Sequence, residues 1–437
     1  MTTVIVGGGP AGTLTALALL RHTDQRVVLV DPAERLGPGT AFATREPHHL
    51  LNSRAGAMSA APDAPADFVD WCHRSGYRVS ANAFQARGWF GDYLADRLAG
   101  AFQRHGDRLL HRRAHVLRIV PGGQWRLQLT AGPEQRADHV VLAIGHAPPR
   151  FPLVAQAPVR EAPGYVATPW EAHALDGIAA GDRVLLLGTG LTAVDVVLSL
   201  IARGHRGQIT AVSRHGLLPL PHLGSPAGPL PPPLPGAPTV RELLRQFRTV
   251  AVDDWRSLVD RVRLQAEPLW RGLPLDERRR FLRHALRLWE VHRHRCAPWA
   301  ANAIDRTRDA GLLMVHKGGP TAIRTVGRAF DVDLGGEPQG FDVVVNCTGP
   351  GHPAGIPLVR TLVADGLARA DPLGLGVDVD LDGRLVPYDG GTSPAPYVVG
   401  ALRLGQWLET TAIPEIRQQA HHVARAIGSN GAMPTAA

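Results

Sequence analysis

The chain has 437 residues, and its excess of basic over acidic side chains gives a formal charge of +8 at pH 7. Its three cysteines, Cys72, Cys296 and Cys347, form no CxxC pair, which argues against a disulfide framework, a structural zinc site and a redox-active dithiol. The sequence has neither an apolar run of about 20 residues, the length of a membrane span, nor a basic leader at its start. We therefore expect a cytoplasmic protein with no membrane partner and no metal.

The basic residues are almost all arginines, because Lys317 is the only lysine. This replacement of lysine by arginine is typical of GC-rich coding sequences. No helix-turn-helix, RNA-binding motif or Cys/His finger spacing accompanies the positive charge. The sequence therefore indicates no nucleic-acid partner.

The N-terminal segment predicts a strand over 3–6, a helix over 14–20 and a second strand over 27–30. The glycines between the first strand and the helix stand at GxGxxG spacing. In this motif the first glycine makes a tight turn, the second admits a pyrophosphate and the third lets the helix pack on the strand. An acid at the end of the second strand can accept a hydrogen bond from a ribose hydroxyl. The residues assigned to this first nucleotide are Gly7, Gly9, Pro10, Ala11, Gly12 and Asp31.

The same pattern recurs in the middle of the chain. A strand over 183–187 precedes a GxGxxA turn and a helix, and the next strand, over 208–212, ends in Ser213 and Arg214 in place of an acid. A guanidinium forks onto phosphate oxygens, so this ending favours the 2′-phosphate of NADPH, whereas the acid of the first copy favours FAD or NAD. The residues assigned to the second nucleotide are Gly188, Gly190, Leu191, Thr192, Ala193, Ser213 and Arg214.

Two further predicted strands share an acid, six residues and a glycine. They run from Asp138 to Gly145 and from Asp342 to Gly349, and we expect them to return the chain between two nucleotide-binding domains. Gly145 and Gly349 are therefore predicted to border the cofactors. Cys347 falls inside the second of these strands, which favours a small buried residue over a reactive thiolate.

A proline-rich loop over 217–238 leads into a segment, 240–308, that is predicted to be mostly helical. Between Asp276 and Arg295 apolar residues recur at helical spacing, and His292 and Arg293 continue their inward-facing stripe. This pair either binds an anionic substrate or only caps the end of the helix. A buried arginine needs an anionic partner, which would be a substrate carboxylate or an Asp or Glu of the chain.

Beyond these motifs, the sequence resembles the two-dinucleotide-binding-domain flavoproteins, a group that includes flavin-dependent N-hydroxylating and Baeyer–Villiger monooxygenases. Within this group it is most similar to bacterial FAD-NAD(P)-binding proteins, among them aspartate N-monooxygenases that form nitrosuccinate. The segments that carry the resemblance are 37–42, 49–52, 58–60, Phe68 with Trp71, 84–94, 188–195, 213–216, 289–295, 346–350 and the tail from Gly400 to Ala420.

The resemblance implies a role for several residues outside the glycine motifs. Asn52 and Met58 would border the flavin ring, and Arg87 would help to hold FAD. The backbone after Gly400 would face the pyrimidine end of the flavin, where a helix dipole stabilises a reduced anion. Thr410 and Thr411, in the same tail, are also expected at the cofactor.

These observations predict an α/β fold with two interleaved Rossmann-like domains and a helical insert. We expect an FAD-binding domain split between 1–165 and 351–437, and an NADPH-binding domain over 166–350 that contains the proline-rich loop and the insert (217–308). The expected reaction consumes NADPH and O2 and N-oxygenates a small amine or amino acid through the C4a-hydroperoxide of FAD. The chemistry is carried by the flavin, and no side chain is assigned as a catalytic acid or base.

Two other functions are compatible with the sequence. One is an NADPH-dependent flavin oxidoreductase that passes electrons to an acceptor without oxygenation. The other is a non-catalytic flavin-binding sensor, which two complete nucleotide motifs argue against. The sequence leaves open whether the chain is a monomer or a homo-oligomer.

Overall fold

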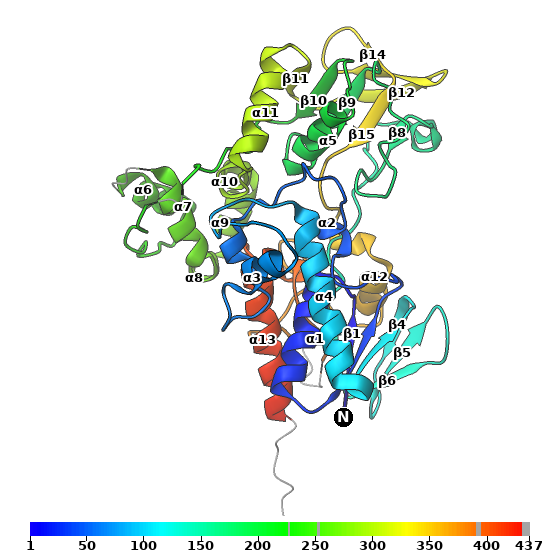
Figure 1. Cartoon of the computed structure of the whole chain (residues 1–437), viewed down its shortest axis with the longest axis vertical. Coiled ribbons are helices and arrows are strands. Elements are labelled where there is room, and N and C mark those ends of the chain that lie inside the picture. Colours follow the sequence, from blue (N-terminus) through cyan, green and yellow to red (C-terminus); the bar gives the residue numbers. More distant parts are fainter. Residues whose placement is uncertain (226–227, 251–253, 390–394, 431–437) are drawn as a thin grey trace, which may run out of the picture.

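The computed structural model describes residues 1–225, 228–250, 254–389 and 395–430, and its two five-stranded parallel sheets follow one another along the long axis of the molecule (Figure 1). The first sheet has the strand order β16-β7-β1-β2-β3. Its strands are β1 (Thr2–Val6), β2 (Arg26–Val30), β3 (Leu109–Arg112), β7 (His139–Leu142) and β16 (Tyr397–Val398).

Three helices accompany this sheet. The first, α1 (Pro10–His22), connects β1 to β2, α4 (Arg87–His105) precedes β3, and α13 (Ile413–Asn430) packs along α1 (Figure 1). The strands are apolar on both sides: Ile5 and Leu29 join the core that contains α1 and α13, whereas Val4 and Val28 join the core on the opposite side. A parallel sheet covered on both faces requires such a continuous apolar run.

The second sheet has the order β11-β10-β9-β15-β8. Helix α5 (Leu191–Ala202) connects β9 to β10, and α11 (Pro298–Asp309) packs beside α5. The strands are β8 (Tyr165–Val166), β9 (Val184–Leu187), β10 (Ile209–Ser213), β11 (Leu313–Lys317) and β15 (Val343–Asn346). The predicted α/β fold with two Rossmann-like sheets is thereby confirmed.

The two sheets repeat one another in detail. In each, a three-stranded antiparallel sheet is inserted between two strands of the parallel sheet. The first insertion, between β3 and β7, consists of β4 (Val116–Val120), β5 (Trp125–Leu129) and β6 (Gln135–Ala137), and the second, between β11 and β15, consists of β12 (Ala322–Val326), β13 (Ala329–Asp333) and β14 (Gln339–Phe341). The acids of the two acid–glycine strands also make the same contact. Asp138 Oδ2 accepts a hydrogen bond from the Thr2 amide at 2.6 Å, and Asp342 Oδ2 accepts one from the Arg183 amide at 2.8 Å. Both acids therefore fix the start of the central strand of their sheet.

The helical insert lies to one side of the two sheets (Figure 1). The helical segment expected between residues 276 and 295 is two helices, which meet at Ala285. The helices of the insert are α6 (Val240–Thr249), α7 (Trp255–Leu264), α8 (Ala266–Gly272), α9 (Leu275–His284) and α10 (Leu286–Arg293).

Shorter helices complete the architecture: α2 (Gly39–Phe42), α3 (Asp67–Arg74) and α12 (Pro357–Ala364). Over the described parts of the chain, no helix has the combination of length and apolarity that crossing a membrane requires.

Candidate functional site

The first glycine loop has the backbone geometry that a nucleotide cradle needs. Gly7 has φ +106°, and a Cβ there would lie 2.4 Å from the Ala143 carbonyl oxygen. A Cβ on Gly12 would lie 1.8 Å from the Gly7 carbonyl oxygen, so the third glycine is required for packing of α1 on β1. By contrast, a Cβ on Gly9 would meet only Gly39, at 3.5 Å. The fold therefore tolerates a side chain at Gly9, and the space beside the Gly9 backbone is open to a ligand.

The N-terminus of α1 can hold an anion. Its N-cap residue is Gly9, so no side chain caps the first amide groups, and Pro10 occupies the first turn. Such free N–H groups at the positive end of a helix bind pyrophosphate. Asp31 lies at the end of β2, where its carboxylate accepts hydrogen bonds from the Gly8 and Ala33 amides at 2.7 and 2.8 Å. The loop is thus held in place by the acid predicted to meet the ribose, and its shape fits the adenosine pyrophosphate of FAD.

The second glycine loop repeats this geometry. Gly188 has φ +125°, and a Cβ there would lie 2.3 Å from the Cys347 carbonyl oxygen. Helix α5 is also uncapped, because its N-cap residue is Gly190. Thr192 and Ala193 lie in the first turn of α5, beside this uncapped end. Gly145 and Gly349 have φ +70° and +83° just beyond β7 and β15.

Basic side chains gather where β10 and β11 end. Arg214 is exposed directly after β10, and the β10–β11 register places Ser213 opposite Lys317. The only lysine of the chain is therefore a neighbour of the predicted 2′-phosphate site, which the sequence pattern did not reveal. A third basic residue, Arg287 of α10, donates to the Leu217 carbonyl at 2.7 Å and to the Thr189 hydroxyl at 3.3 Å, beside the second glycine loop.

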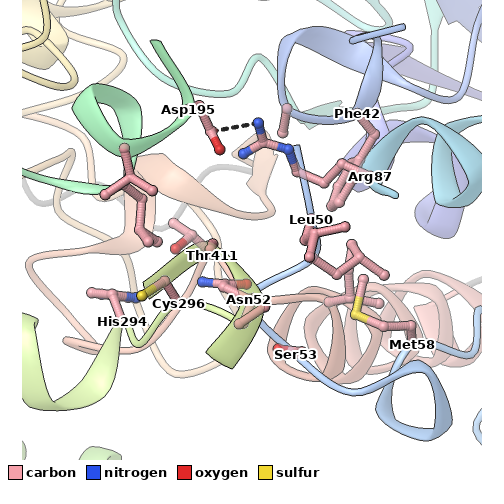
Figure 2. Close-up of a pocket in the computed structure, with 18 of the residues that line it drawn as sticks. Phe42, Leu50, Asn52, Ser53, Met58, Arg87, Asp195, His294, Cys296 and Thr411 are labelled. Atoms are coloured by element: carbon pink, nitrogen blue, oxygen red, sulfur yellow. Dashed lines mark hydrogen bonds and ion pairs between the residues drawn. The ribbon is translucent and has the colours of Figure 1, made fainter. Parts of the chain in front are cut away.

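A cavity of about 180 Å³ is lined by residues of both Rossmann units and of the insert (Figure 2). Residues from α2, α4, α5, α10 and the chain just before α13 line it. It brings together six residues that the sequence assigned to a site, from segments far apart in the chain: Asn52, Met58, Arg87, Leu191, Arg293 and Thr411. Thr410, the neighbour of Thr411, is buried and does not line the cavity.

A buried ion pair crosses this cavity from one Rossmann unit to the other. Arg87, the first residue of α4, donates from Nη2 to Asp195 Oδ2 of α5 at 2.6 Å (Figure 2). The Arg87 guanidinium also stands over the Trp170 ring, 4.9 Å from its centroid. His49 reinforces the contact by bonding the Ser199 hydroxyl at 2.8 Å and approaching the Asp195 carbonyl at 3.1 Å. Sequence patterns gave no indication of Asp195, which lies in the interior of an apolar helix.

Arg293 lies at the wall of the cavity and has a carboxylate partner within the chain. Its Nη2 lies 3.0 Å and its Nε 3.1 Å from Glu409 Oε2, and both side chains are only 8% exposed. The indole N–H of Trp289 donates to the other carboxylate oxygen at 3.2 Å. The buried Arg293 is therefore paired with an acid of the chain, which is one of the two partners that the sequence left open.

His292 does not reach this cavity. Its Nδ1 lies 2.8 Å from the Leu288 carbonyl oxygen of its own helix, and its ring packs edge-on against Trp255. His294 does line the cavity, and burial together with the positive Arg293 lowers its pKa to about 4, so it is neutral at pH 7. Cys296, also at the wall, is held as a thiol because burial raises its pKa to about 11.

The C-terminal segment predicted to face the flavin also approaches the first loop. Gly400 has φ +92°, and its Cβ would lie 3.5 Å from the Ala11 Cβ at the start of α1. The Gly400 amide donates to the buried Gln419 side chain at 2.8 Å. The buried polar atoms that have no partner among the described residues include the Thr410 hydroxyl and Arg87 Nε. A cofactor that accepts these hydrogen bonds fits the cradle.

Comparison with known proteins agrees with this architecture. Residues 4–147 match the family described as FAD-NAD(P)-binding. A curated relative is the tRNA 5-methylaminomethyl-2-thiouridine biosynthesis bifunctional protein of Chromohalobacter salexigens, 30% identical over 211 residues, which are 42% of this chain and 27% of that protein. The chain thus spans about a quarter of the length of this relative.

Solved structures match the chain almost end to end. An ornithine N-hydroxylase of Kutzneria sp. 744, determined with reduced FAD, NADP+ and L-ornithine, has a TM-score of 0.66 at 16% identity over 98% of this chain and 99% of that one. Ornithine hydroxylase of Pseudomonas aeruginosa gives 0.64 at 17% identity over 98% and 99%. Bacillithiol disulfide reductase of Bacillus cereus gives 0.60 at 14% identity, over 98% and 99%. The chain thus shares its fold with two ornithine hydroxylases and with a disulfide reductase.

Proposed function

We propose that this chain, whose residues 4–147 form an FAD-NAD(P)-binding domain within a two-dinucleotide-binding flavoprotein fold, is an NADPH-consuming monooxygenase that N-oxygenates a small anionic amine or amino acid. The observation that carries the proposal is the cavity of about 180 Å³, because residues of both nucleotide units and of the insert line it. Bound FAD supplies the redox chemistry there, including reaction with O2.

The residues of the chain bind and orient the reactants. The uncapped ends of α1 and α5 would hold the two pyrophosphates, with Asp31 at the ribose of FAD and Arg214 at the 2′-phosphate of NADPH. Asn52, Met58 and Thr411 would border the flavin ring from the wall of the cavity. The buried Arg87–Asp195 pair would position one unit against the other and keep bulk water from the reacting centre.

Arg293 is the residue we propose to meet the substrate. Glu409 holds its guanidinium by Nε and Nη2, which aims the group while leaving it at the cavity wall. A carboxylate of the substrate would add a charge-assisted hydrogen bond to this group. The amine of that substrate must be unprotonated to attack an electrophilic oxygen, so product formation should rise with pH on the alkaline side.

A second candidate function is electron transfer from NADPH to an acceptor without oxygenation, because a disulfide reductase shares the fold. The cysteines of this chain do not favour a thiol–disulfide version of it. All three are buried and free, and the one at the cavity wall, Cys296, has a raised pKa that disfavours a thiolate. An acceptor other than a disulfide remains compatible with the site.

One experiment separates these functions. FAD-loaded protein, NADPH and O2 are incubated with a panel of amino acids and simple amines, and the products are analysed for hydroxylamine, nitroso and nitro compounds alongside hydrogen peroxide. We expect one anionic amine to couple NADPH consumption to N-oxygenated product. Fast reduction of artificial acceptors, with only hydrogen peroxide formed in the presence of every amine, would support the reductase instead.

A further inference from the structure

His294 is a cavity-lining side chain whose ring nitrogens are not used by the fold. It follows Arg293, the last residue of α10, and lines the cavity of about 180 Å³ together with Asn52, Cys296 and Thr411 (Figure 2). Over the described residues, neither ring nitrogen has a hydrogen-bond partner, and neither is among the polar atoms sealed inside the fold. Both nitrogens are therefore open to a reactant in the cavity.

Two other histidines near the cavity have their rings engaged. His49 bonds the Ser199 hydroxyl at 2.8 Å, and a ring nitrogen of His222 lies 3.0 Å from the Asn52 carbonyl oxygen. These two rings hold neighbouring segments of the chain together. The described chain shows no such structural task for the ring nitrogens of His294.

The surroundings keep the His294 imidazole uncharged at pH 7. Burial lowers its pKa to about 4, and the positive charges of Arg293 and Arg287 of α10 and Arg263 of α7 act in the same direction. The Glu409 carboxylate opposes them. The ring is thus a neutral base, and one of its nitrogens carries a free lone pair in either tautomer.

The other possible proton acceptors at the cavity are less suitable. Asp195 is already paired with Arg87 at 2.6 Å, and burial raises the pKa of the Cys296 thiol to about 11, which disfavours a thiolate. His48 also lines the cavity, but its ring stacks on that of Trp299, which is 46% exposed. His48 therefore lies toward the solvent rather than inside the cavity.

N-oxygenation of an amine requires a proton acceptor once the N–O bond forms. The lone pair of the nitrogen makes this bond, the O–O bond of the reduced dioxygen breaks, and its electron pair stays on the second oxygen atom. NADPH supplies the two electrons of the overall reaction. The nitrogen is then positively charged and must lose one N–H proton, while the second oxygen atom must gain one to depart as water.

A weak base is suited to this proton transfer. An oxygenated ammonium nitrogen is a stronger acid than the parent ammonium ion, because the attached oxygen withdraws electron density. A weakly basic imidazole is therefore sufficient to accept its proton, and it is also unprotonated before the reaction begins. A strongly basic group at the same place would already hold a proton at pH 7.

We propose that His294 is a catalytic residue that accepts the N–H proton of the substrate nitrogen as the N–O bond forms. The inference rests on the proposed function and deepens it, because it assigns the proton transfer to a side chain of the insert. The accepted proton then joins the oxygen atom that departs as water, so the imidazole is neutral again at the end of each cycle.

The first test measures the N-oxygenated product formed per NADPH consumed, with L-aspartate, L-ornithine and butylamine as probes. His294→Gln keeps a polar side chain of similar size that accepts no proton. We expect it to lower the rate of product formation at least about a hundredfold, as for loss of a general base, with hydrogen peroxide released instead. The matched control is His292→Gln, because a ring nitrogen of His292 bonds its own helix outside the cavity.

Rescue of His294→Ala by added bases separates proton transfer from space filling. Imidazole and pyrazole have rings of the same size, but pyrazole is the much weaker base. We expect imidazole to restore product formation and pyrazole to restore little of it. Thermal unfolding and flavin absorbance show that each variant compared is folded and loaded with FAD.

A further readout needs no turnover. The imidazole signals of His294 are identified in NMR spectra of FAD-loaded protein by their loss in His294→Gln, and they are then followed with pH. We expect the ring to be neutral at pH 7 and to gain a proton only in acid, because of its burial and the neighbouring Arg293. A ring that is already protonated at pH 7 has no lone pair for the substrate proton and would contradict the inference.

The outcomes distinguish this inference from the proposed function. Product formation at the wild-type rate in His294→Gln, or equal rescue of His294→Ala by imidazole and pyrazole, would overturn the role of His294 and leave the proposed function intact. Wild-type protein that is loaded with FAD and yields only hydrogen peroxide with every probe would overturn the proposed function, and the inference with it.

Discussion

At the scale of single residues, Gly9 and Gly12 of the first loop have different roles. A Cβ on Gly9 meets only Gly39, at 3.5 Å, whereas one on Gly12 would lie 1.8 Å from the Gly7 carbonyl oxygen. We therefore expect Gly9→Ala to fold normally and to lose FAD, because the new methyl group occupies the space that the pyrophosphate needs. Gly12→Ala should instead destabilise the domain itself. Flavin absorbance of the purified protein and its thermal unfolding distinguish these results. A Gly9→Ala protein that retains a full complement of FAD would show that the pyrophosphate lies elsewhere.

The choice between NADPH and NADH is also a matter of single side chains. Arg214 follows β10, and Lys317 lies opposite Ser213 at the end of β11. We expect Arg214→Ala and Lys317→Ala each to weaken NADPH binding by about 1.5–3 kcal/mol, the contribution of a hydrogen bond to a charged group, with little effect on NADH. The KM values for both nucleotides measure this difference. Lys317→Arg should keep the tight binding of NADPH, because it keeps a positive charge at the same position.

Because Lys317 is the only lysine, it can be probed chemically without mutation. An amine-selective reagent should modify it in the free protein, and NADP+ should protect it while NAD+ does not. Mass spectrometry of the labelled peptide measures the protection, with the N-terminal amine as internal control. Equal labelling with and without NADP+ would place Lys317 outside the 2′-phosphate site.

At the scale of elements, the sequence predicts the repeated strands and helices but not the long-range contacts between side chains. The two strand–turn–helix–strand copies were predictable because glycine spacing and apolar runs are local, and α1, α5 and both acid–glycine strands lie close to their expected places. The break at Ala285 was missed because apolar periodicity continues through it. The partner of Arg293 was undetermined because Glu409 lies 116 residues away. Asp195 was missed because burial among apolar residues of α5 hides it.

The pair between α4 and α5 gives a prediction at this scale. Asp195→Asn removes the charge that compensates Arg87 at a site where the two side chains are 9% and 17% exposed. Breaking a buried pair while leaving one charge behind costs about 3–5 kcal/mol, and the partial exposure of Arg87 favours the lower end. We expect a lower Tm and easier loss of FAD, with less damage in the Arg87→Leu/Asp195→Leu double variant. A double-mutant cycle on the free energy of unfolding measures the coupling; additive single effects would show that the pair does not join the units.

At the scale of the whole molecule, stability should fall in mild acid because the fold keeps several histidines neutral. Burial lowers the pKa of His294 to about 4 and that of His222 to about 3 from an ordinary value of 6.5, with nearby arginines contributing in both cases. His421 of α13, which faces His22 of α1 at 2.9 Å, has a pKa of about 4 through burial and then the neighbouring His22.

The sign of the effect follows from which state binds more protons. Between pH 6.5 and about 4 these imidazoles are protonated in the unfolded chain and neutral in the folded one, so lowering the pH favours unfolding. For the buried His294, the difference between the ordinary pKa of 6.5 and the folded-state pKa of about 4 corresponds to about 3 kcal/mol in the free energy of unfolding. The protein has this stability in full above pH 6.5 and loses it as the pH falls toward 4. We expect Tm to be nearly constant from pH 8 to 7 and to fall steeply below 6.5.

A matched pair of variants assigns the acid sensitivity to these groups. His421→Gln should flatten the dependence of Tm on pH, because glutamine can still bond His22 but does not titrate. His105→Gln is the control, since His105 ends α4 away from the α1–α13 interface and makes no such pair among the described residues. A fall in Tm that is equally steep in wild type and His421→Gln would assign the acid transition to carboxylates instead. Loss of flavin absorbance in parallel with unfolding would further show that the α1–α13 contact holds the FAD cradle, since α1 carries both His22 and the N-terminal amides proposed to bind the pyrophosphate.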